Sequence, residues 1–436
     1  MKAILCKLLF LLFTGTLFAQ SYDIGQYRAR FESRPFLEVT PRISYASIFT
    51  NADVDQDNHQ GRLSASAVWR EQSNLDHRIL SWSLGGNGGF SLQEYDNPDL
   101  PDLSSNDFSL QGSVEQYNYG DSKTFWGFRG NASIDIQNRN EGEDPADRRR
   151  AISINPGLFI GTGRIEFSED ALLANWMMDD LLEAGVITSA SPEQRLALAQ
   201  RVTSIIGNRT FDFRRRRIYE LKQLHTLFQE EEMAIADDFL LFAVLNDNWG
   251  FANRAVLPHG QRWQFGLDLG GNYSFRSLPF AIDGFIALAS PYINFQHANI
   301  HHNNAATIWE VELVGSYTDF LDEGSNGVPS FSAIPEWRGA FNLQHSYVWL
   351  PISRTTLRWT NSINVDFEDF KRRDFSFQQK IWDINLESVL QWDYFITYNW
   401  RLTLNAGIIS RLIYTDVSNV RNLRPYFNVQ TNYAIF

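Results

Sequence analysis

The sequence predicts an all-β transmembrane fold, an antiparallel β-barrel of about 14 strands with a small inserted α-helical domain. Apolar and polar residues alternate with period two in segments of up to about fifteen residues, whereas strands of soluble sheets usually have about five or six. Between Phe167 and Asn248 the period changes to about 3.6, the period of amphipathic helices. A secreted β-sandwich is the alternative all-β fold, and the length of the alternating segments argues against it.

Composition fits a barrel and excludes one class of partner. Aromatic residues make up 14% of the chain, which fits the aromatic belts found at membrane interfaces. The formal net charge is -13, and it becomes -15 when Lys2 and Lys7 are removed with the signal peptide predicted below. Because nucleic-acid binding requires a basic surface, we expect no nucleic-acid partner.

Residues 1–19 are predicted to be a secretory signal peptide. Lysines at positions 2 and 7 accompany an apolar run that extends to Phe18, and the expected cleavage lies at Ala19-Gln20. The only cysteine, Cys6, lies inside this segment, so we expect no disulfide and no lipid-anchor cysteine in the mature chain. No later run of about 18 apolar residues follows, which argues against a transmembrane helix.

Residues 20–166 are predicted to form the first part of the barrel. The clearest strand is the fifth, in which Trp126 and Ile134 face one way and Arg129 and Asp135 face the other. The six expected strands span about 36–49, 60–70, 77–92, 107–119, 123–137 and 150–165.

Residues 167–249 are predicted to form the inserted helical domain. Ser168 is suited to cap a first helix, which Gly185 should end. Ser191-Pro192-Glu193-Gln194 is a capping box that opens a second helix. Two further helices are expected at about 213–232 and 236–245. The first and third helices are expected to pack together, with Leu172, Trp176 and Leu181 facing Leu221, Leu224 and Phe228.

Residues 250–436 are predicted to form the second part of the barrel, with about eight strands. The apolar phase slips by one residue at Ile381-Trp382, which predicts a β-bulge there. The expected strands span about 261–275, 281–297, 305–320, 332–350, 353–367, 374–397, 400–415 and 422–436.

The last two predicted strands, within Trp400–Phe436, form a hairpin that ends on an aromatic residue. This stretch resembles the closing hairpin of Gram-negative outer-membrane β-barrels, whose final strand often ends in Phe and is read by the insertion machinery. The resemblance implies a porin-like protein of the cell outer membrane. It also implies that outer-membrane lipid and that insertion machinery are partners and that the C-terminus lies in the periplasm.

An even number of strands makes short periplasmic turns alternate with longer outer loops. The helical insertion follows the sixth strand, so the same parity places it in the periplasm. The predicted outer loops include 50–59, 93–106, 138–149, 321–331, 366–373 and 416–421, and the predicted inner turns include 71–76, 120–122, 350–353 and 398–399.

The first predicted outer loop contains a candidate metal site. Asp53, Asp55 and Asp57 occupy alternate positions, as in the first half of a calcium loop. The glycine of that motif is absent and Ser64 stands where its bidentate glutamate belongs, so a solvated acidic loop is the alternative. The histidines show no short zinc spacing, and no catalytic serine–histidine or aspartate–histidine motif is present. We therefore expect neither a cofactor nor an enzyme.

A basic run, Arg214, Arg215, Arg216 and Arg217, begins the third predicted helix, where the helix macrodipole disfavours positive charge. One interpretation is internal pairing with Asp179, Asp180 and Glu183 of the first helix. The other is a patch that binds an anionic partner, such as a periplasmic protein.

The leading functional hypothesis is a pore or transporter for small solutes, because charged residues on the lipid-facing side would cost about 2–4 kcal/mol each and must therefore point inward. The alternative is an envelope scaffold, or an assembly or export component, whose helical domain binds a protein partner. A hydrolase embedded in the barrel is a third possibility. The predicted lumen-lining residues are Arg129, Asp135, Asp268, Asn272, Glu310, Glu312, Arg358 and Arg411.

Overall fold

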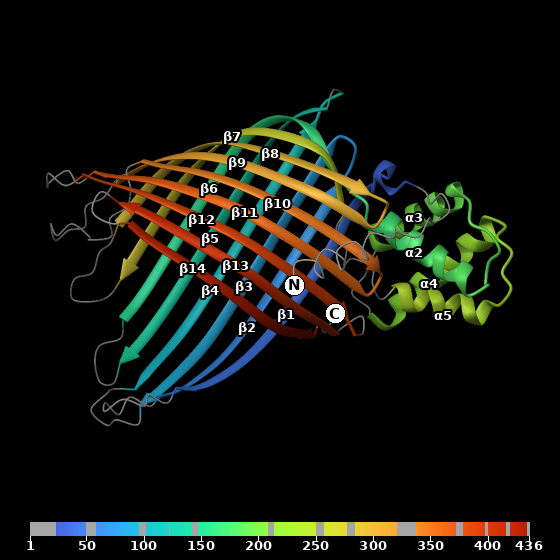
Figure 1. Ribbon diagram of the computed structural model, residues 1–436, viewed down its shortest axis with the longest axis horizontal. Coiled ribbons are helices and arrows are strands. Elements are labelled where there is room, and N and C mark those ends of the chain that lie inside the picture. The colour runs from blue at the N-terminus through green and yellow to red at the C-terminus, as the bar shows by residue number, and fades with distance from the viewer. Residues whose placement is uncertain are drawn as a thin grey trace, which may run out of the picture.

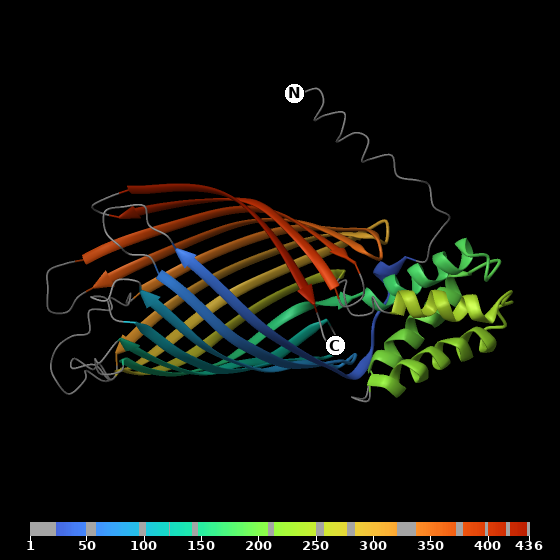
Figure 2. The same cartoon turned by 90° about the horizontal axis from the view of Figure 1, so that it is seen from below.

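The computed structural model is a fourteen-stranded antiparallel β-barrel with a helical domain at one end (Figures 1 and 2), so the predicted fold class is confirmed. We refer to the end that carries the helices as the helix end and to the opposite end as the loop end. The structure describes residues 23–48, 58–95, 102–121, 123–141, 147–207, 213–249, 257–276, 284–320, 337–371, 378–396, 400–415 and 419–433.

Each strand pairs with the next strand in the sequence, in the order β1 to β14. The sheet curls round and brings the first and last strands to the same side of the molecule (Figure 2). The first six strands are β1 (Phe31–Ile48), β2 (Asn58–Asn74), β3 (Arg78–Tyr95), β4 (Leu103–Tyr119), β5 (Thr124–Glu141) and β6 (Asp147–Phe167). The other eight are β7 (Pro258–Arg276), β8 (Gly284–His301), β9 (Ala305–Phe320), β10 (Trp337–Ile352), β11 (Thr355–Lys371), β12 (Gln378–Phe395), β13 (Trp400–Thr415) and β14 (Asn419–Tyr433).

The bulge predicted at Ile381-Trp382 was wrong. Strand β12 keeps one continuous register with both neighbours, and Ile381 pairs with Glu368 on β11 and Thr415 on β13. Trp382 is exposed on the outer face. The apparent phase slip arises because an apolar residue, Ile381, occupies an inward position near the loop end.

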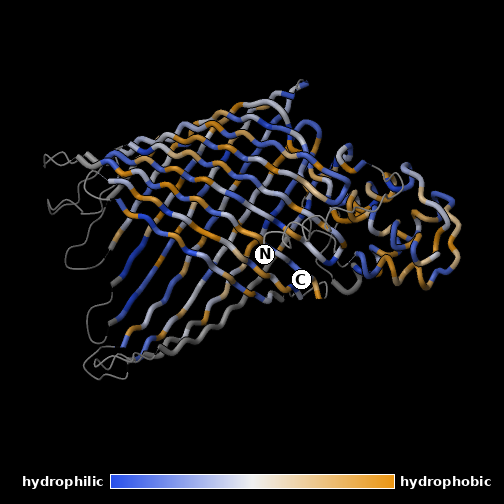
Figure 3. Tube along the Cα trace, in the orientation of Figure 1, coloured by the Kyte–Doolittle hydropathy of each residue, from blue (hydrophilic) through white to orange (hydrophobic). Residues whose placement is uncertain are grey.

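Hydrophilic and hydrophobic residues alternate along the strands (Figure 3), and the large apolar residues of the strands are exposed on the outer face. Leu158, Ile160 and Phe427 are 68%, 64% and 69% exposed. On β12 the rims are marked by Trp382 and Trp392, ten residues apart. That separation is about 33 Å along the strand and about 23 Å along the axis at a tilt of about 45°, close to the ~25 Å apolar band of outer-membrane barrels. Such a surface belongs in an outer membrane, as predicted.

The helical domain follows β6 and precedes β7. Ser168 stands at the N-cap of the first helix, but the predicted side-chain cap is wrong, because its hydroxyl bonds to His259 Nδ1 instead. The helices are α2 (Glu169–Glu183), α3 (Pro192–Gly207), α4 (Phe213–Glu230) and α5 (Asp238–Trp249). Gly185 has a φ of 69° after α2, the left-handed conformation that glycine adopts at helix ends. At α3 the capping box is present, since Gln194 N donates to Ser191 Oγ at 3.2 Å and Ser191 N donates to Gln194 Oε1 at 2.9 Å. Among the helices of the described residues, none has the length and apolarity needed to cross a bilayer.

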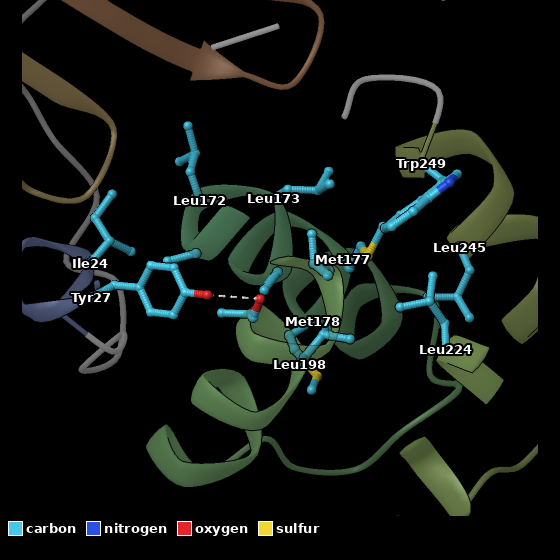
Figure 4. Packing of buried hydrophobic residues seen from close by; sticks show 14 of the residues in the cluster. Ile24, Tyr27, Leu172, Leu173, Met177, Met178, Leu198, Leu224, Leu245 and Trp249 are labelled. Atoms are coloured by element: carbon cyan, nitrogen blue, oxygen red, sulfur yellow. Dashed lines mark hydrogen bonds between the residues drawn. The ribbon is translucent and has the colours of Figure 1, made fainter. Parts of the chain in front are cut away.

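The core of the helical domain lies between all four helices (Figure 4). Leu172 and Met177 of α2, Leu224 and Phe228 of α4, and Leu245 of α5 are fully buried or nearly so. The expected direct packing of α2 on α4 is wrong in detail, because α2 contacts chiefly α3 and α5. Trp176 is only partly buried at the edge of this core.

An N-terminal segment, residues 23–30, crosses the helix end of the barrel. It contains a short 3-10 helix, η1 (Ile24–Gln26), whose Ile24 N donates to Asn303 Oδ1 in the β8–β9 turn at 3.1 Å. Tyr27 donates to the carbonyl oxygen of Ala199 on α3 at 3.0 Å. The segment then enters β1, which is seven strands from β8. It therefore ties the helical domain to both sides of the barrel.

Candidate functional site

The candidate functional site is the inner wall of the barrel. Alternation fixes which residues face inward, because they occupy positions of opposite parity to exposed outer residues such as Trp126, Leu267 and Trp309. The structure places all eight residues predicted for the lumen on this inner face: Arg129, Asp135, Asp268, Asn272, Glu310, Glu312, Arg358 and Arg411.

The inner wall from β4 to β8 carries an aromatic cluster, Tyr117, Phe125, Phe159 and Tyr292. The ring centroids of Tyr117 and Phe159 are 4.9 Å apart, and those of Tyr117 and Phe125 are 5.3 Å apart. Glycine on a neighbouring strand makes room for three of the four rings: a Cβ atom at Gly127, for example, would lie 2.4 Å from the Phe159 ring. The cluster therefore depends on small residues and fills this part of the interior.

Arg129 and Asp268 form an ion pair beside the aromatic cluster. Arg129 Nε lies 2.8 Å from Asp268 Oδ1, and the guanidinium carbon lies 3.8 Å from the centroid of the Tyr292 ring. The two side chains meet over Gly157 on β6, the strand between theirs. A Cβ atom at this position would overlap the Asp268 carboxylate. Because their charges compensate each other, these two predicted residues contribute to the wall rather than to the charge of the lumen.

Glu310 and Glu312 on β9 are bonded to amides. Gln296 Nε2 donates to Glu310 Oε1 at 2.9 Å, and Asn342 Nδ2 lies 3.3 Å from Glu312 Oε2. Among the described residues neither glutamate has an arginine at ion-pair distance. Their negative charges are therefore hydrogen-bonded but not neutralised.

A hollow of about 780 Å³ lies on the inner wall between β8 and β14, toward the loop end. Five of its lining residues are consecutive register partners and form one row across five strands. The row consists of Asn342, Asn364, Asn385, Arg411 and Asn422. Amide groups therefore dominate the middle of this wall.

Two ion pairs line the loop-end side of the same hollow. Arg338 Nη2 lies 2.7 Å from Asp366 Oδ1, and Arg411 Nε lies 3.0 Å from Asp383 Oδ1. Of these four residues, sequence reasoning singled out only Arg411. The inward parity of the others was visible in the alternation, but their pairing depends on the register between strands, which the alternation does not determine.

Two arginines at the helix end join the N-terminal segment and the helical domain to the barrel. Arg30 donates to both carboxylate oxygens of Glu166 at 2.8 and 2.9 Å. Arg34 on β1 bonds to Asp170 of α2 at 2.6 Å and to Glu169 at 3.2 Å. Burial, and then the neighbouring Asp170 carboxylate, raise the pKa of Glu169 to about 7. This junction could not be predicted from the alternation of residues, because residues 23–35 have no clear period.

The other predicted sites lie mostly outside the described residues. Asp53, Asp55 and Asp57 lie outside the described residues, as do the side chains of Arg214, Arg215 and Arg216. Arg217 donates to Asn246 of α5, and Asp179 pairs with Arg195 of α3; the internal pairing of the arginine run stays a prediction. No group of three or more potential metal ligands occurs in the described part of the chain.

Comparison with known proteins gives likeness of fold only. No protein-family model matches the sequence, and a search of curated proteins finds no match. Among solved structures, the β domain of the Bordetella autotransporter BrkA matches with a TM-score of 0.28 and 8% identity, covering 76% of this chain and 91% of that one. The translocator domain of the autotransporter NalP from Neisseria meningitidis has a TM-score of 0.29 and 7% identity, with coverages of 92% and 88%.

A mutant of the monoaromatic hydrocarbon channel TodX has a TM-score of 0.36 and 8% identity, covering 97% of this chain and 94% of that one. At these TM-scores the function has to be argued from the residues of this chain.

Proposed function

We propose that this protein is a pore or transporter that carries small solutes across the outer membrane. The hollow between β8 and β14 is the observation that carries the proposal, because it provides space beside a hydrogen-bonding wall inside the barrel. Fourteen strands enclose more space than the roughly eight whose interior side chains can just fill. The aromatic cluster occupies the β4–β8 wall, so the solute path runs past the hollow on the β8–β14 wall.

The helical domain and the N-terminal segment contact only part of the barrel wall among the described residues: β1, the ends of β6 to β10 and the β10–β11 turn. We propose that the solute path passes this end beside the remaining strands. On β10 the buried residues Val348 and Leu350 belong to the helical core. We place this end in the periplasm, in line with the parity of the strands.

Single-channel recording in planar lipid bilayers tests the proposed function. The purified full chain should give discrete current steps, and a heat-unfolded sample of the same preparation should give none. A folded barrel that inserts into the bilayer without conducting would overturn the proposal.

A second candidate function is an envelope scaffold, or an assembly or export component, that binds a periplasmic protein. Exposed apolar residues on the helical domain favour it: Phe239 on α5 is 83% exposed, and Ile218 and Tyr219 on α4 are 59% and 56% exposed. Solvent-exposed aromatic residues of this size are enriched at protein interfaces. Crosslinking from Phe239 in cells tests this candidate, which fails if no product of higher mass forms.

We propose no enzymatic activity. Ser168 Oγ and His259 Nδ1 are 2.9 Å apart, the kind of pair that nucleophilic catalysis uses. Ser168 is fully buried at the start of α2, however, so a substrate has no access to its hydroxyl. The insertion machinery of the outer membrane and outer-membrane lipid remain the partners we expect.

A further inference from the structure

We propose that the hollow between β8 and β14 binds a sugar-sized, polyhydroxylated solute. The inference rests on the proposed function, since it names the class of solute for the same wall. Its volume of about 780 Å³ lies within the usual range for small-molecule sites, about 300–1,000 Å³.

The amide row supplies the hydrogen-bonding groups. Asn342, Asn364 and Asn385 are register partners on three adjacent strands, so their backbones are spaced by about 4.8 Å. Each amide carries an acceptor oxygen and a donor nitrogen side by side. One amide can therefore bond two neighbouring hydroxyl groups, and the spacing of the row is comparable with the width of a sugar ring.

Four of the five charged residues that line the hollow form two ion pairs, and the fifth, Arg424 on β14, offers further donors to hydroxyl oxygens. Asp366 and Asp383 are each bonded to an arginine, Arg338 and Arg411 respectively, so neither carboxylate attracts cations strongly. The arginine nitrogens also offer donors to hydroxyl oxygens. Apolar side chains, among them Val314 and Ile409, line the rest of the hollow and can contact the C–H groups of a sugar ring.

Block of the single-channel current by D-glucose tests the site, with triethylene glycol as the probe of similar mass that lacks hydroxyl density. Glucose should interrupt the current in a concentration-dependent manner, and triethylene glycol should only lower it in proportion to viscosity. The double variant Asn364→Leu/Asn385→Leu should weaken the block by about tenfold or more, the loss expected for two hydrogen-bonding groups.

The matched control is Asn405→Leu, which removes an inward amide of β13 outside the hollow. Glucose should block the current of this variant as strongly as it blocks that of the parent. Heat-modifiable migration on gels shows that each variant folds.

The outcomes separate this inference from the proposed function. Equal effects of glucose and triethylene glycol on a conducting parent would overturn the sugar site and leave the pore intact. If glucose blocks the folded double variant as strongly as the parent, the sugar site is likewise overturned and the pore is left intact. If the parent does not conduct, equilibrium binding of glucose to the purified protein, lost in the double variant, would support the site while the pore fails. Absence of binding there would overturn the site.

Discussion

Arg411 on β13 donates to both carboxylate oxygens of Asp383 on β12, with its Nε atom 3.0 Å from Oδ1 and its Nη2 atom bonded to Oδ2. The two residues line the hollow on the inner wall. This geometry is the bidentate pairing that makes arginine–carboxylate bonds strong and directional. It removes the charge of Asp383 from the lumen, whereas Glu310 and Glu312, bonded to neutral amides, keep theirs.

The first prediction concerns ion selectivity. Replacing both glutamates, Glu310→Gln and Glu312→Gln, should lower the preference for cations, because two charges without an arginine partner in the described wall are removed. Reversal potentials across a salt gradient measure the effect. Asp383→Asn is the informative comparison: it frees the positive charge of Arg411 and should also shift the reversal potential toward anions. If the double glutamate variant has the same ion selectivity as the parent, the prediction is contradicted, because the current then does not pass the two glutamates on β9.

The second prediction concerns pH. Because the pKa of Glu169 is raised from 4.5 to about 7, the folded junction binds more protons than the unfolded chain between those values. The stability that this group contributes therefore falls as the pH rises from about 5 to 8. The melting temperature of the helical signal in circular dichroism should fall over that range.

Glu169→Gln should remove most of this decline. Glu193→Gln is the control: the Ser191 hydroxyl donates to Glu193 and lowers its pKa, so the residue stays ionised throughout this range. A decline that is the same in the parent and in Glu169→Gln would contradict the assignment.

The third prediction concerns the core of the helical domain. Phe228→Ala should destabilise it by about 3–5 kcal/mol, since the side chain is fully buried. Phe239→Ala removes the same side chain from an exposed position and should change the stability by less than about 0.5 kcal/mol. Limited proteolysis of the insertion compares the two, and equal cleavage rates would mean that the helices do not share this core.

Sequence reasoning predicted the barrel well because alternation is a local property. The predicted bounds of β9 and β13, 305–320 and 400–415, agree with the structure at every residue. Alternation also placed Arg411 on the inner face. It did not identify Asp383 as its partner, because contacts between strands follow from the register, and one residue of shift would change every pair.

The bonds between the N-terminal residues and the helix end of the barrel could not be predicted from the sequence, for a different reason. Arg30 and Arg34 precede the region of clear alternation, and their partners Glu166 and Asp170 are about 136 residues away. Trp176 shows the same limit within the helical domain. Its position on an apolar stripe suggested burial, whereas the packing of α2 against α3 and α5 leaves it at the edge.

The fourth prediction concerns topology. A cysteine at Gln200, an exposed position on α3, should not react with a membrane-impermeant maleimide in intact cells, because the helical domain is predicted to be periplasmic. A cysteine at Glu143, in a predicted outer loop, should react. Labelling at Gln200 while the outer membrane is intact would reverse the orientation.

The central claim is that solutes pass along the inner wall of β8 to β14. Asn364 and Ile363 are adjacent on β11; Asn364 lines the hollow, and Ile363 is exposed on the outer face. Each can be replaced by cysteine in the mature chain, since the only natural cysteine is Cys6. A charged methanethiosulfonate reagent should reduce the single-channel current of Asn364→Cys and leave that of Ile363→Cys unchanged. Full modification of Asn364→Cys, verified by mass spectrometry, with no change in current would contradict the claim.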